Sequence, residues 1–367
     1  MLDMPVETKD ARFERIAEKV IAGERLSFED GVALFHHPNL TELSALAHYV
    51  RMRKNPQPYV TYVIGRIINY TNVCWVRCKF CSFYRPPKDS EGYLLSDEEI
   101  LQKIEELVQQ GGVEVLIQGG LNPKLKIDYF ERIFRLIKQH YPQVIIHGLS
   151  PAEILYIAHI SRLSIRDCLI RLREAGLNSV PGAGGEILVD RVRKEIAPFK
   201  DTTQEWLDFM REVHQLGMRS SASMMFGHVE TLEDRVEHLM RLRELQDETG
   251  GFTAFICWNF QPEGTALHHI RKATAYDYLR TVAVARLMLD NFDHLQASIL
   301  TQGPKIAQIA LRYGVDDMGS TMIEENVVSA QGTKFILNAH EIERLIRDAG
   351  FIPKRRNTRY EILEDGA

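Results

Sequence analysis

Predicted strands and helices alternate along the chain from about residue 59, and this alternation constrains the fold more than any other feature. Segments with the helical spacing of apolar residues separate short strands that are rich in apolar and β-branched residues. The predicted strands cover residues 59–67, 113–120, 144–151, 177–186, 219–228, 252–262, 294–300 and 316–322. Strands this apolar are typical of a parallel sheet buried on both faces. Eight strand–helix units therefore predict an α/β fold, a TIM-like (β/α)8 barrel, closed or nearly closed.

The remaining residues are predicted to extend this barrel at both ends. The first 57 residues have helical patterns, and Ser27 with Asp30 forms a capping-box pattern at the start of one helix. We therefore expect a helical N-terminal extension over residues 1–57 and a barrel core over residues 58–305. The last barrel unit and a small α/β extension are expected over residues 306–367.

Composition and charge restrict the class of partner. Hydrophobic residues make up 45% of the 367 residues and charged residues 26%, as in ordinary globular proteins with a large core. The formal net charge of -5 argues against nucleic acid as the main partner. The basic run 353–359 is interpreted as a solvated tail, with contact to a carboxylate or another anion as the alternative. No membrane span or signal peptide is apparent, so we expect a cytoplasmic protein without a membrane partner.

Three of the five cysteines, Cys74, Cys78 and Cys81, lie close together in the loop after the first predicted strand. Structural zinc sites have four ligands, usually in two pairs, and the sequence has no second pair. Cys168 and Cys257 are isolated in a predicted helix and a predicted strand, so we expect both in the core. Three thiolates on a [4Fe–4S] cluster leave one iron open for a reacting molecule, unlike the four thiolates of a ferredoxin. The cysteine pattern favours such an open cluster.

The Cys-x3-Cys-x2-Cys spacing resembles the motif of the radical S-adenosylmethionine (SAM) superfamily. The resemblance implies that Cys74, Cys78 and Cys81 hold a [4Fe–4S] cluster whose open iron binds the amine and carboxylate of SAM. One electron from an external donor, such as flavodoxin or ferredoxin, then releases a 5′-deoxyadenosyl radical. The loop follows the first barrel strand, and barrel enzymes keep their chemistry at this end of the strands.

Glycine-rich or polar residues also follow the later predicted strands. The resemblance implies that the glycine pair after the second strand contacts the methionyl amine of SAM, and that Glu186 binds its ribose. A tight turn is the alternative for the glycines, and helix capping is the alternative for Ser150. The residues expected to bind the cofactor are Gln118, Gly119, Gly120, Ser150, Glu186 and Arg219.

Longer blocks are similar to the cyclic dehypoxanthine futalosine synthase family, which acts in the futalosine route to menaquinone. These blocks include INYTNVCWVRCKFCSFYR (68–85), SVPGAGGEILVDRVR (179–193) and GSTMIEENVVSA (319–330). The resemblance implies a small-molecule substrate, dehypoxanthine futalosine, which loses its ribose C4′ hydrogen to the radical and closes a ring onto its benzoate. Aminofutalosine synthase and the deazaflavin (FO) synthase subunits share this skeleton and remain alternatives. An iron–sulfur electron carrier without catalytic activity is the remote alternative.

The implied reaction needs a base for the ring proton and a cation for the benzoate. His228 follows the glycine at the end of the fifth predicted strand, and imidazoles titrate near neutrality, so it is the predicted base. Arg219 is the predicted cation. Polar residues near the ends of the last three strands are expected to hydrogen-bond the substrate. They are Asn259, Gln261, Ser298, Thr301, Gln302, Ser320, Glu324 and Glu325.

Overall fold

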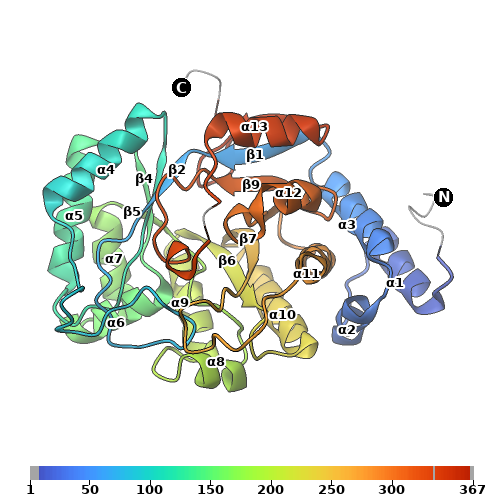
Figure 1. Ribbon diagram of the computed structural model, residues 1–367, viewed down its shortest axis with the longest axis horizontal. Coiled ribbons are helices and arrows are strands. Elements are labelled where there is room, and N and C mark those ends of the chain that lie inside the picture. The colour runs from blue at the N-terminus through green and yellow to red at the C-terminus, as the bar shows by residue number, and fades with distance from the viewer. Residues whose placement is uncertain (1–7, 334, 364–367) are drawn as a thin grey trace.

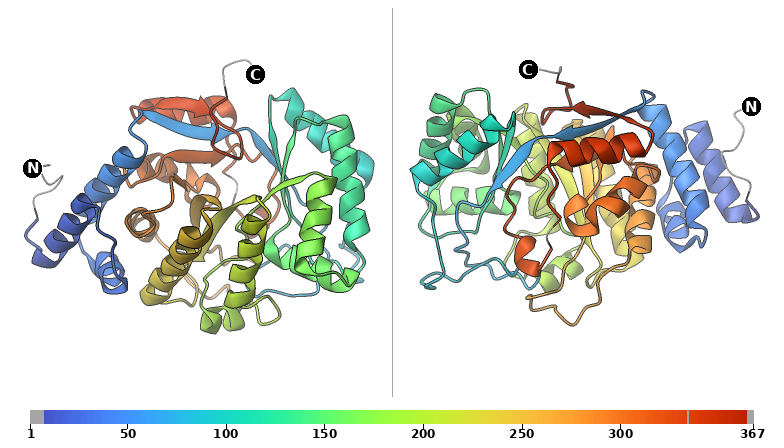
Figure 2. Two further views of the ribbon diagram at one scale, coloured as in Figure 1. Left: turned by 180° about the vertical axis from the view of Figure 1, so that it is seen from behind. Right: turned by 45° about the horizontal axis from the view of Figure 1, so that its top comes forward.

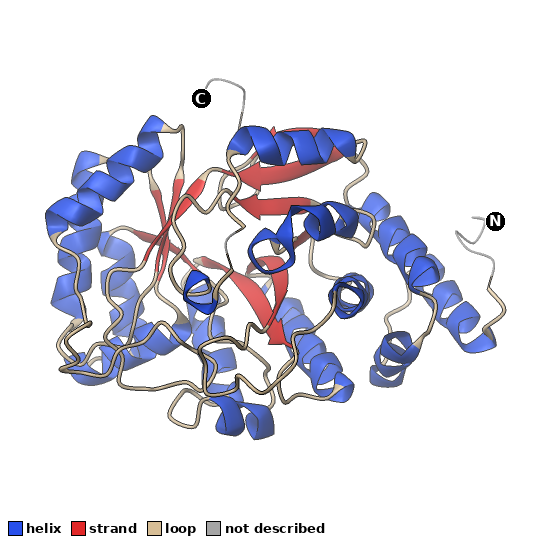
Figure 3. Cartoon of the chain, in the orientation of Figure 1, coloured by secondary structure: helices blue, strands red, loops and turns tan. Residues whose placement is uncertain are grey.

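A curled parallel sheet surrounded by helices forms the centre of the protein (Figures 1 and 3). The computed structural model describes residues 8–333 and 335–363. The strands in these residues are β1 (Tyr59–Val63), β2 (Gly65–Ile68), β3 (Glu114–Ile117), β4 (Ile145–Gly148), β5 (Leu177–Val180), β6 (Arg219–Phe226), β7 (Phe252–Asn259), β8 (His294–Gln296), β9 (Asp317–Ser320) and β10 (Ile352–Arg355). They pair in the order β10-β1-β9-β8-β7-β6-β5-β4-β3-β2.

The sheet closes on itself at the first strand. Only Ile64 separates β1 from β2 in the chain, yet β1 pairs with β9 whereas β2 pairs with β3. The backbone N–H groups of Thr321 and Ile323 donate to the carbonyls of Val63 and Gly65, both at 3.1 Å. The first predicted strand is therefore one interrupted strand, and together with β3 to β9 it forms the predicted eight-stranded TIM-like barrel. The additional strand β10 pairs with β1 outside this closure.

Helices cover the outside of the barrel. Several begin with a capping box, including those that follow Ser27, Ser96 and Thr202, as the sequence predicted for Ser27. The helices are α1 (Ala11–Ala22), α2 (Phe28–His36), α3 (Leu40–Lys54), α4 (Asp97–Gln109), α5 (Ile127–His140), α6 (Pro151–Ser161), α7 (Ile165–Ala175), α8 (Asp190–Ile196), α9 (Thr203–Gln215), α10 (Leu232–Thr249), α11 (Ala275–Met288), α12 (Ile299–Ala310), η1 (Ser329–Gln331) and α13 (Ala339–Asp348). Across the described residues, none of them is long and apolar enough to span a bilayer.

The N-terminal helices form a layer at one side of the barrel (Figure 2). Helix α3 packs against α11, and α2 packs against both α10 and α11. The contact is close at Gly31 of α2, where an added Cβ would lie 2.9 Å from a methyl group of Val236. Because α11 is covered by the barrel on one side and by these helices on the other, most of its residues are buried.

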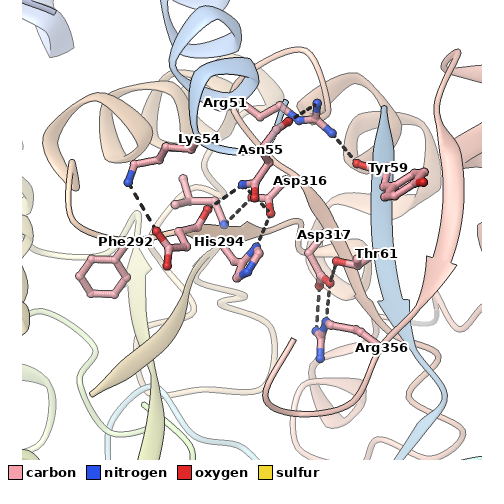
Figure 4. A network of polar contacts seen from close by, with 12 residues as sticks. Arg51, Lys54, Asn55, Tyr59, Thr61, Phe292, His294, Asp316, Asp317 and Arg356 are labelled. Atoms are coloured by element: carbon pink, nitrogen blue, oxygen red, sulfur yellow. Dashed lines mark hydrogen bonds and ion pairs between the residues drawn. The ribbon is translucent and has the colours of Figure 1, made fainter. Parts of the chain in front are cut away.

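A polar network lies at the amino ends of the barrel strands (Figure 4). His294 Nδ1 lies 2.6 Å from a carboxylate oxygen of Asp316. The neighbouring Asp317 accepts from the Thr61 hydroxyl at 2.6 Å and from Arg356 Nε at 2.5 Å. Arg356 is only 4% exposed, so the prediction of a solvated tail over 353–359 is wrong for this residue, and the alternative of a carboxylate contact is confirmed. Positive charge does not by itself imply exposure, because a buried carboxylate such as that of Asp317 can pair with it.

Candidate active site

A cavity of about 400 Å³ runs through the inside of the barrel. At the carboxyl ends of the strands its walls include Cys74, Cys78, Cys81, Gly120, Ser150 and Glu186. At the amino ends its walls include Glu114, Thr253, Arg356, Thr358 and Tyr360. The cavity therefore joins the predicted cluster loop to a floor that the C-terminal segment completes, and the sequence did not predict this floor.

The cysteine loop is held by backbone hydrogen bonds at its base. Cys74 N–H donates to the Arg85 carbonyl at 2.9 Å, and Arg85 N–H donates to the Asn72 carbonyl at 2.7 Å. All three thiols line the cavity, whereas no three His, Cys, Asp or Glu side chains among residues 8–333 and 335–363 converge closely enough to hold a single metal ion. Burial raises the pKa of the Cys78 thiol to about 12, and positive charge nearby, such as that of Lys200, opposes this change and favours the thiolate.

The glycine pair after β3 packs directly against the cysteine loop. A Cβ on Gly120 would lie 2.4 Å from the Val73 carbonyl oxygen and 2.9 Å from Cys74 Cβ. A Cβ on Gly119 would lie 2.8 Å from the Tyr70 ring. Both positions require glycine because the two loops approach so closely. Together with Gln118, the pair lines the cavity beside the thiols.

Ser150 caps α6, as the alternative interpretation held, and it also lines the cavity. Its capping partner Glu153 is 2% exposed and has a second set of contacts that the sequence did not reveal. One oxygen of Glu153 accepts from the Gly119 N–H and from the Tyr70 hydroxyl, both at 2.9 Å. Glu153 therefore ties the glycine pair to the start of α6. The capping-box spacing was visible in the sequence, but its contact across strands was not.

Glu186 lines the cavity on the loop after β5, where the sequence predicted it. Its carboxylate lies 2.6 Å from Lys200 Nζ, a partner that sequence reasoning missed. Burial opposes the charge of Lys200, yet Glu186 and Cys78 together raise its pKa. Lys200 therefore keeps a positive charge next to the cysteine loop. No sequence signal marks this residue, because the contact depends on how the segment after α8 folds back.

His228 does not reach the cavity, and its prediction as the base has to be corrected. Its side chain is fully buried. Nε2 lies 2.9 Å from the Met225 carbonyl, and Nδ1 lies 2.8 Å from the Val229 N–H. Nε2–H donates to the Met225 carbonyl and the lone pair of Nδ1 accepts from the Val229 N–H, so the ring has no free lone pair to take a proton from a substrate. His228 is one of the satisfied structural histidines.

Arg219 also lies away from the cavity, and its predicted roles are corrected in the same way. It is the exposed first residue of β6, and its guanidinium donates to the Gly250 carbonyl. The first residue of a parallel strand lies at the amino end of the barrel, opposite the cysteine loop. Arg219 therefore contacts neither a cofactor beside the thiols nor a benzoate in the cavity.

The predicted substrate-binding residues divide into two groups. Four of them line the cavity: Ser298, Thr301, Ser320 and Glu325. The other four do not line it: Asn259, Gln261, Gln302 and Glu324. Two of this second group bond to each other, Gln302 Nε2 to Asn259 Oδ1, and Glu324 pairs with Arg66 at 2.7 Å. Cys168 and Cys257 are buried in α7 and β7, as the sequence predicted for core residues.

Comparisons with known proteins agree with this geometry. The Radical SAM superfamily profile matches residues 68–242, and the CofH/MqnC C-terminal region profile matches residues 249–366. The crystal structure of methylornithine synthase superposes with a TM-score of 0.74 at 20% identity, over 93% of this chain and 97% of that one. At this identity, the similarity to methylornithine synthase shows a shared fold and not a shared reaction.

Curated relatives match over nearly the whole chain. The cyclic dehypoxanthine futalosine synthase of Halalkalibacterium halodurans is 47% identical over 95% of this chain and 94% of its own length. The enzyme of the same name from Streptomyces coelicolor is 43% identical over 97% of this chain and 90% of its own. The aminodeoxyfutalosine synthase of Thermus thermophilus is 41% identical over 96% of both chains.

A parallel barrel with three clustered thiols and a glycine pair at one end of its cavity defines a radical SAM enzyme. Membership of that class implies a [4Fe–4S] cluster and SAM as cofactors. Within the superfamily, the chain belongs to the cyclic dehypoxanthine futalosine synthase family.

Proposed function

We propose that this chain binds a [4Fe–4S] cluster through Cys74, Cys78 and Cys81, and that it uses SAM to convert dehypoxanthine futalosine to cyclic dehypoxanthine futalosine in menaquinone biosynthesis. One observation carries the proposal: three thiols and a glycine pair line one barrel cavity in a chain 47% identical to an enzyme of that name. An external one-electron donor such as flavodoxin or ferredoxin is part of the proposal, as is a cytoplasmic location.

The residues present fit an iron–sulfur cluster with one open iron. Three thiols face the same cavity, and the other two cysteines are buried elsewhere in the core. The ammonium of Lys200 lies near the Cys78 thiol and offsets the negative charge that thiolate ligands bring. When bound, the cluster and SAM supply a 5′-deoxyadenosyl radical. Thiolate ligation by three residues, with a cation beside them, is the contribution of this chain to that chemistry.

Four further parts of the cavity wall would hold SAM beside the cluster. Gly119 and Gly120 expose backbone without side chains in the way, next to Cys74. Ser150 and Glu186 lie on the following two loops around the same rim. Lys200 fixes the carboxylate of Glu186, which favours one orientation for accepting a hydrogen bond from a ribose hydroxyl.

The rest of the barrel would orient the substrate and exclude water. The ribose carbon that loses hydrogen has to lie against the radical carbon, and fixing two reacting atoms in this way lowers the entropic part of the barrier. Ser298, Thr301 and Ser320 supply hydroxyl groups on the cavity wall for a polyhydroxylated substrate. Because residues of the C-terminal segment line the amino end of the cavity, we expect the substrate to enter from the carboxyl rim.

An anaerobic assay followed by mass spectrometry tests the proposal. Reconstituted protein is mixed with SAM, a strong reductant and dehypoxanthine futalosine, with Cys78→Ser protein as the control. We expect 5′-deoxyadenosine together with a product two hydrogens lighter than the substrate, and neither compound from the control. Intact substrate with continued 5′-deoxyadenosine formation would contradict the proposed substrate, and the aminodeoxyfutalosine and deazaflavin reactions would be assayed next. Bound iron without any SAM cleavage would indicate an electron carrier.

A further inference from the structure

Ring closure on an aromatic ring requires a group that accepts the displaced ring proton, and most acidic groups around the cavity are already engaged. Glu186 is paired with Lys200 at 2.6 Å. Glu153 accepts from the Gly119 N–H, and Glu325 accepts from the backbone N–H groups after it. A role for such a group rests on the proposed cyclase function, because ring closure is the step that releases the proton.

His147 is the only histidine that lines the cavity in the described part of the chain. It lies on β4, where its neighbour in the pairing with β5 is Ser179. His147 Nδ1 is 2.7 Å from Ser179 Oγ, whereas Nε2 has no hydrogen-bond partner within residues 8–333 and 335–363. One nitrogen is therefore anchored to the barrel wall, and the other remains available to a molecule in the cavity.

The surroundings of His147 suit a proton acceptor. The charged groups that act on it are Glu114 on β3 and Arg356 on the segment after β10. Burial lowers the pKa of His147, Glu114 opposes this change, and Arg356 adds to it. The imidazole is therefore neutral at physiological pH, and the neutral form is the one that accepts a proton.

We propose that Nε2 of His147 accepts the ring proton during cyclisation, with Ser179 as the positioning residue. Attack of the C4′ radical forms the new carbon–carbon bond and leaves an adduct radical on the ring. The C–H bond at the attacked carbon then breaks, its proton goes to Nε2, and one electron leaves to a one-electron acceptor of the iron–sulfur class. The Nδ1–H group donates to the Ser179 hydroxyl throughout, which keeps the lone pair on Nε2 directed into the cavity.

The test compares His147→Gln with wild-type protein by the ratio of 5′-deoxyadenosine to cyclic product. Hydrogen abstraction does not need the base, so 5′-deoxyadenosine still forms in the variant, whereas cyclic product falls about 100-fold or more. Substrate labelled with deuterium on the ring should show a larger isotope effect on product formation in the variant. Calorimetry on cluster-free protein should give substrate affinity within about threefold of wild type.

Two further variants make the result decisive. His228→Gln should keep the wild-type ratio, because that histidine does not line the cavity. Ser179→Ala removes only the hydrogen-bond partner of the His147 imidazole. It should raise the ratio of 5′-deoxyadenosine to cyclic product about tenfold. This variant tests the proposal even if His147→Gln does not fold. An unchanged ratio in both His147→Gln and Ser179→Ala, or a loss of substrate affinity that lowers both products in parallel, would overturn the proposal. Wild-type protein that forms no cyclic product would instead contradict the proposed function.

Discussion

At the scale of single residues, the cluster loop depends on contacts that cross between neighbouring strands. Gly120 allows the loop after β3 to touch Val73 and Cys74, and Glu153 anchors Gly119 from the start of the next helix. The side chains that hold the loop are therefore not the ones that would bind iron. Changing them should alter cluster binding without removing any ligand.

Replacing Gly120 with alanine should lower the amount of iron that the protein binds. The added Cβ would overlap with backbone at 2.4 Å from the Val73 carbonyl oxygen, and backbone cannot move aside as a flexible side chain can. Iron and sulfide content after anaerobic reconstitution measures the effect. Gly217→Ala is the control for a Gly-to-Ala change that meets no neighbour: nothing lies within 4 Å of its added Cβ, and its φ of +74° adds only local backbone strain. Equal iron content in the two variants would contradict the argument.

Replacing Glu153 with alanine should destabilise the protein more than the same change at Glu205. Both glutamates complete a capping box, so each variant loses a hydrogen bond to the N-cap N–H, about 1 kcal/mol. Only Glu153→Ala also leaves the Gly119 N–H without its acceptor, which costs about 1–3 kcal/mol more. Urea unfolding of the two variants gives the difference. Equal losses of the free energy of unfolding would show that Glu153 acts only as a cap.

At the scale of elements, the C-terminal segment is part of the barrel. Strand β10 pairs with β1, and the residues after it cover the floor of the cavity. The guanidinium carbon of Arg356 lies 4.0 Å from the centroid of the Tyr360 ring. The Tyr360 ring stacks in turn on the His294 ring, with 4.0 Å between the two ring centroids. Arg356 and Asp317 form a buried ion pair between this segment and β9.

Replacing Arg356 with methionine should therefore destabilise the whole barrel. Asp317 is fully buried, and losing its partner leaves an unpaired charge, which costs about 3–5 kcal/mol. Arg359→Met makes the same change at an exposed position of the same segment and should stay within about 0.5 kcal/mol of wild type. Urea unfolding followed by circular dichroism measures both. A stable Arg356→Met protein would show that the fold does not need this ion pair.

At the scale of the whole molecule, the N-terminal helices and the barrel share one core. The core of buried apolar side chains runs without interruption from Phe13 of α1 to Phe351 before β10. Helices α10 and α11 have the N-terminal layer on one side and the strands on the other. We therefore expect the protein to unfold in a single transition rather than in two.

Replacing Gly31 with leucine tests this shared core. The larger side chain would be forced against Val236 and Met288, and overpacking of this kind costs about 1–3 kcal/mol. Glu29→Leu introduces the same residue on the exposed face of the same helix and should change stability by less than about 0.5 kcal/mol. The midpoint of urea unfolding should fall for Gly31→Leu in fluorescence and circular dichroism alike. Two separate transitions would show that the helices fold independently of the barrel.

The amino-acid sequence by itself determined the features that depend on local order. The alternation of strands and helices, the capping pattern at Ser27 and the spacing of the three cysteines were all readable, because each involves residues a few positions apart. The prediction for Arg219 was wrong although the sequence held the necessary signal. Arg219 begins its predicted strand, whereas the active sites of barrel enzymes lie at the carboxyl ends of the strands.

Only the tertiary structure decided which polar side chains meet in the cavity. His228 and His147 both lie at or near the end of a strand, yet the turn after β6 satisfies both nitrogens of His228, whereas His147 of β4 lines the cavity. Lys200 reaches the cysteine loop, and Arg356 is buried by Asp317, through contacts between segments far apart in the chain. The direction and partners of a side chain depend on how distant segments pack, and local patterns carry no information about that packing.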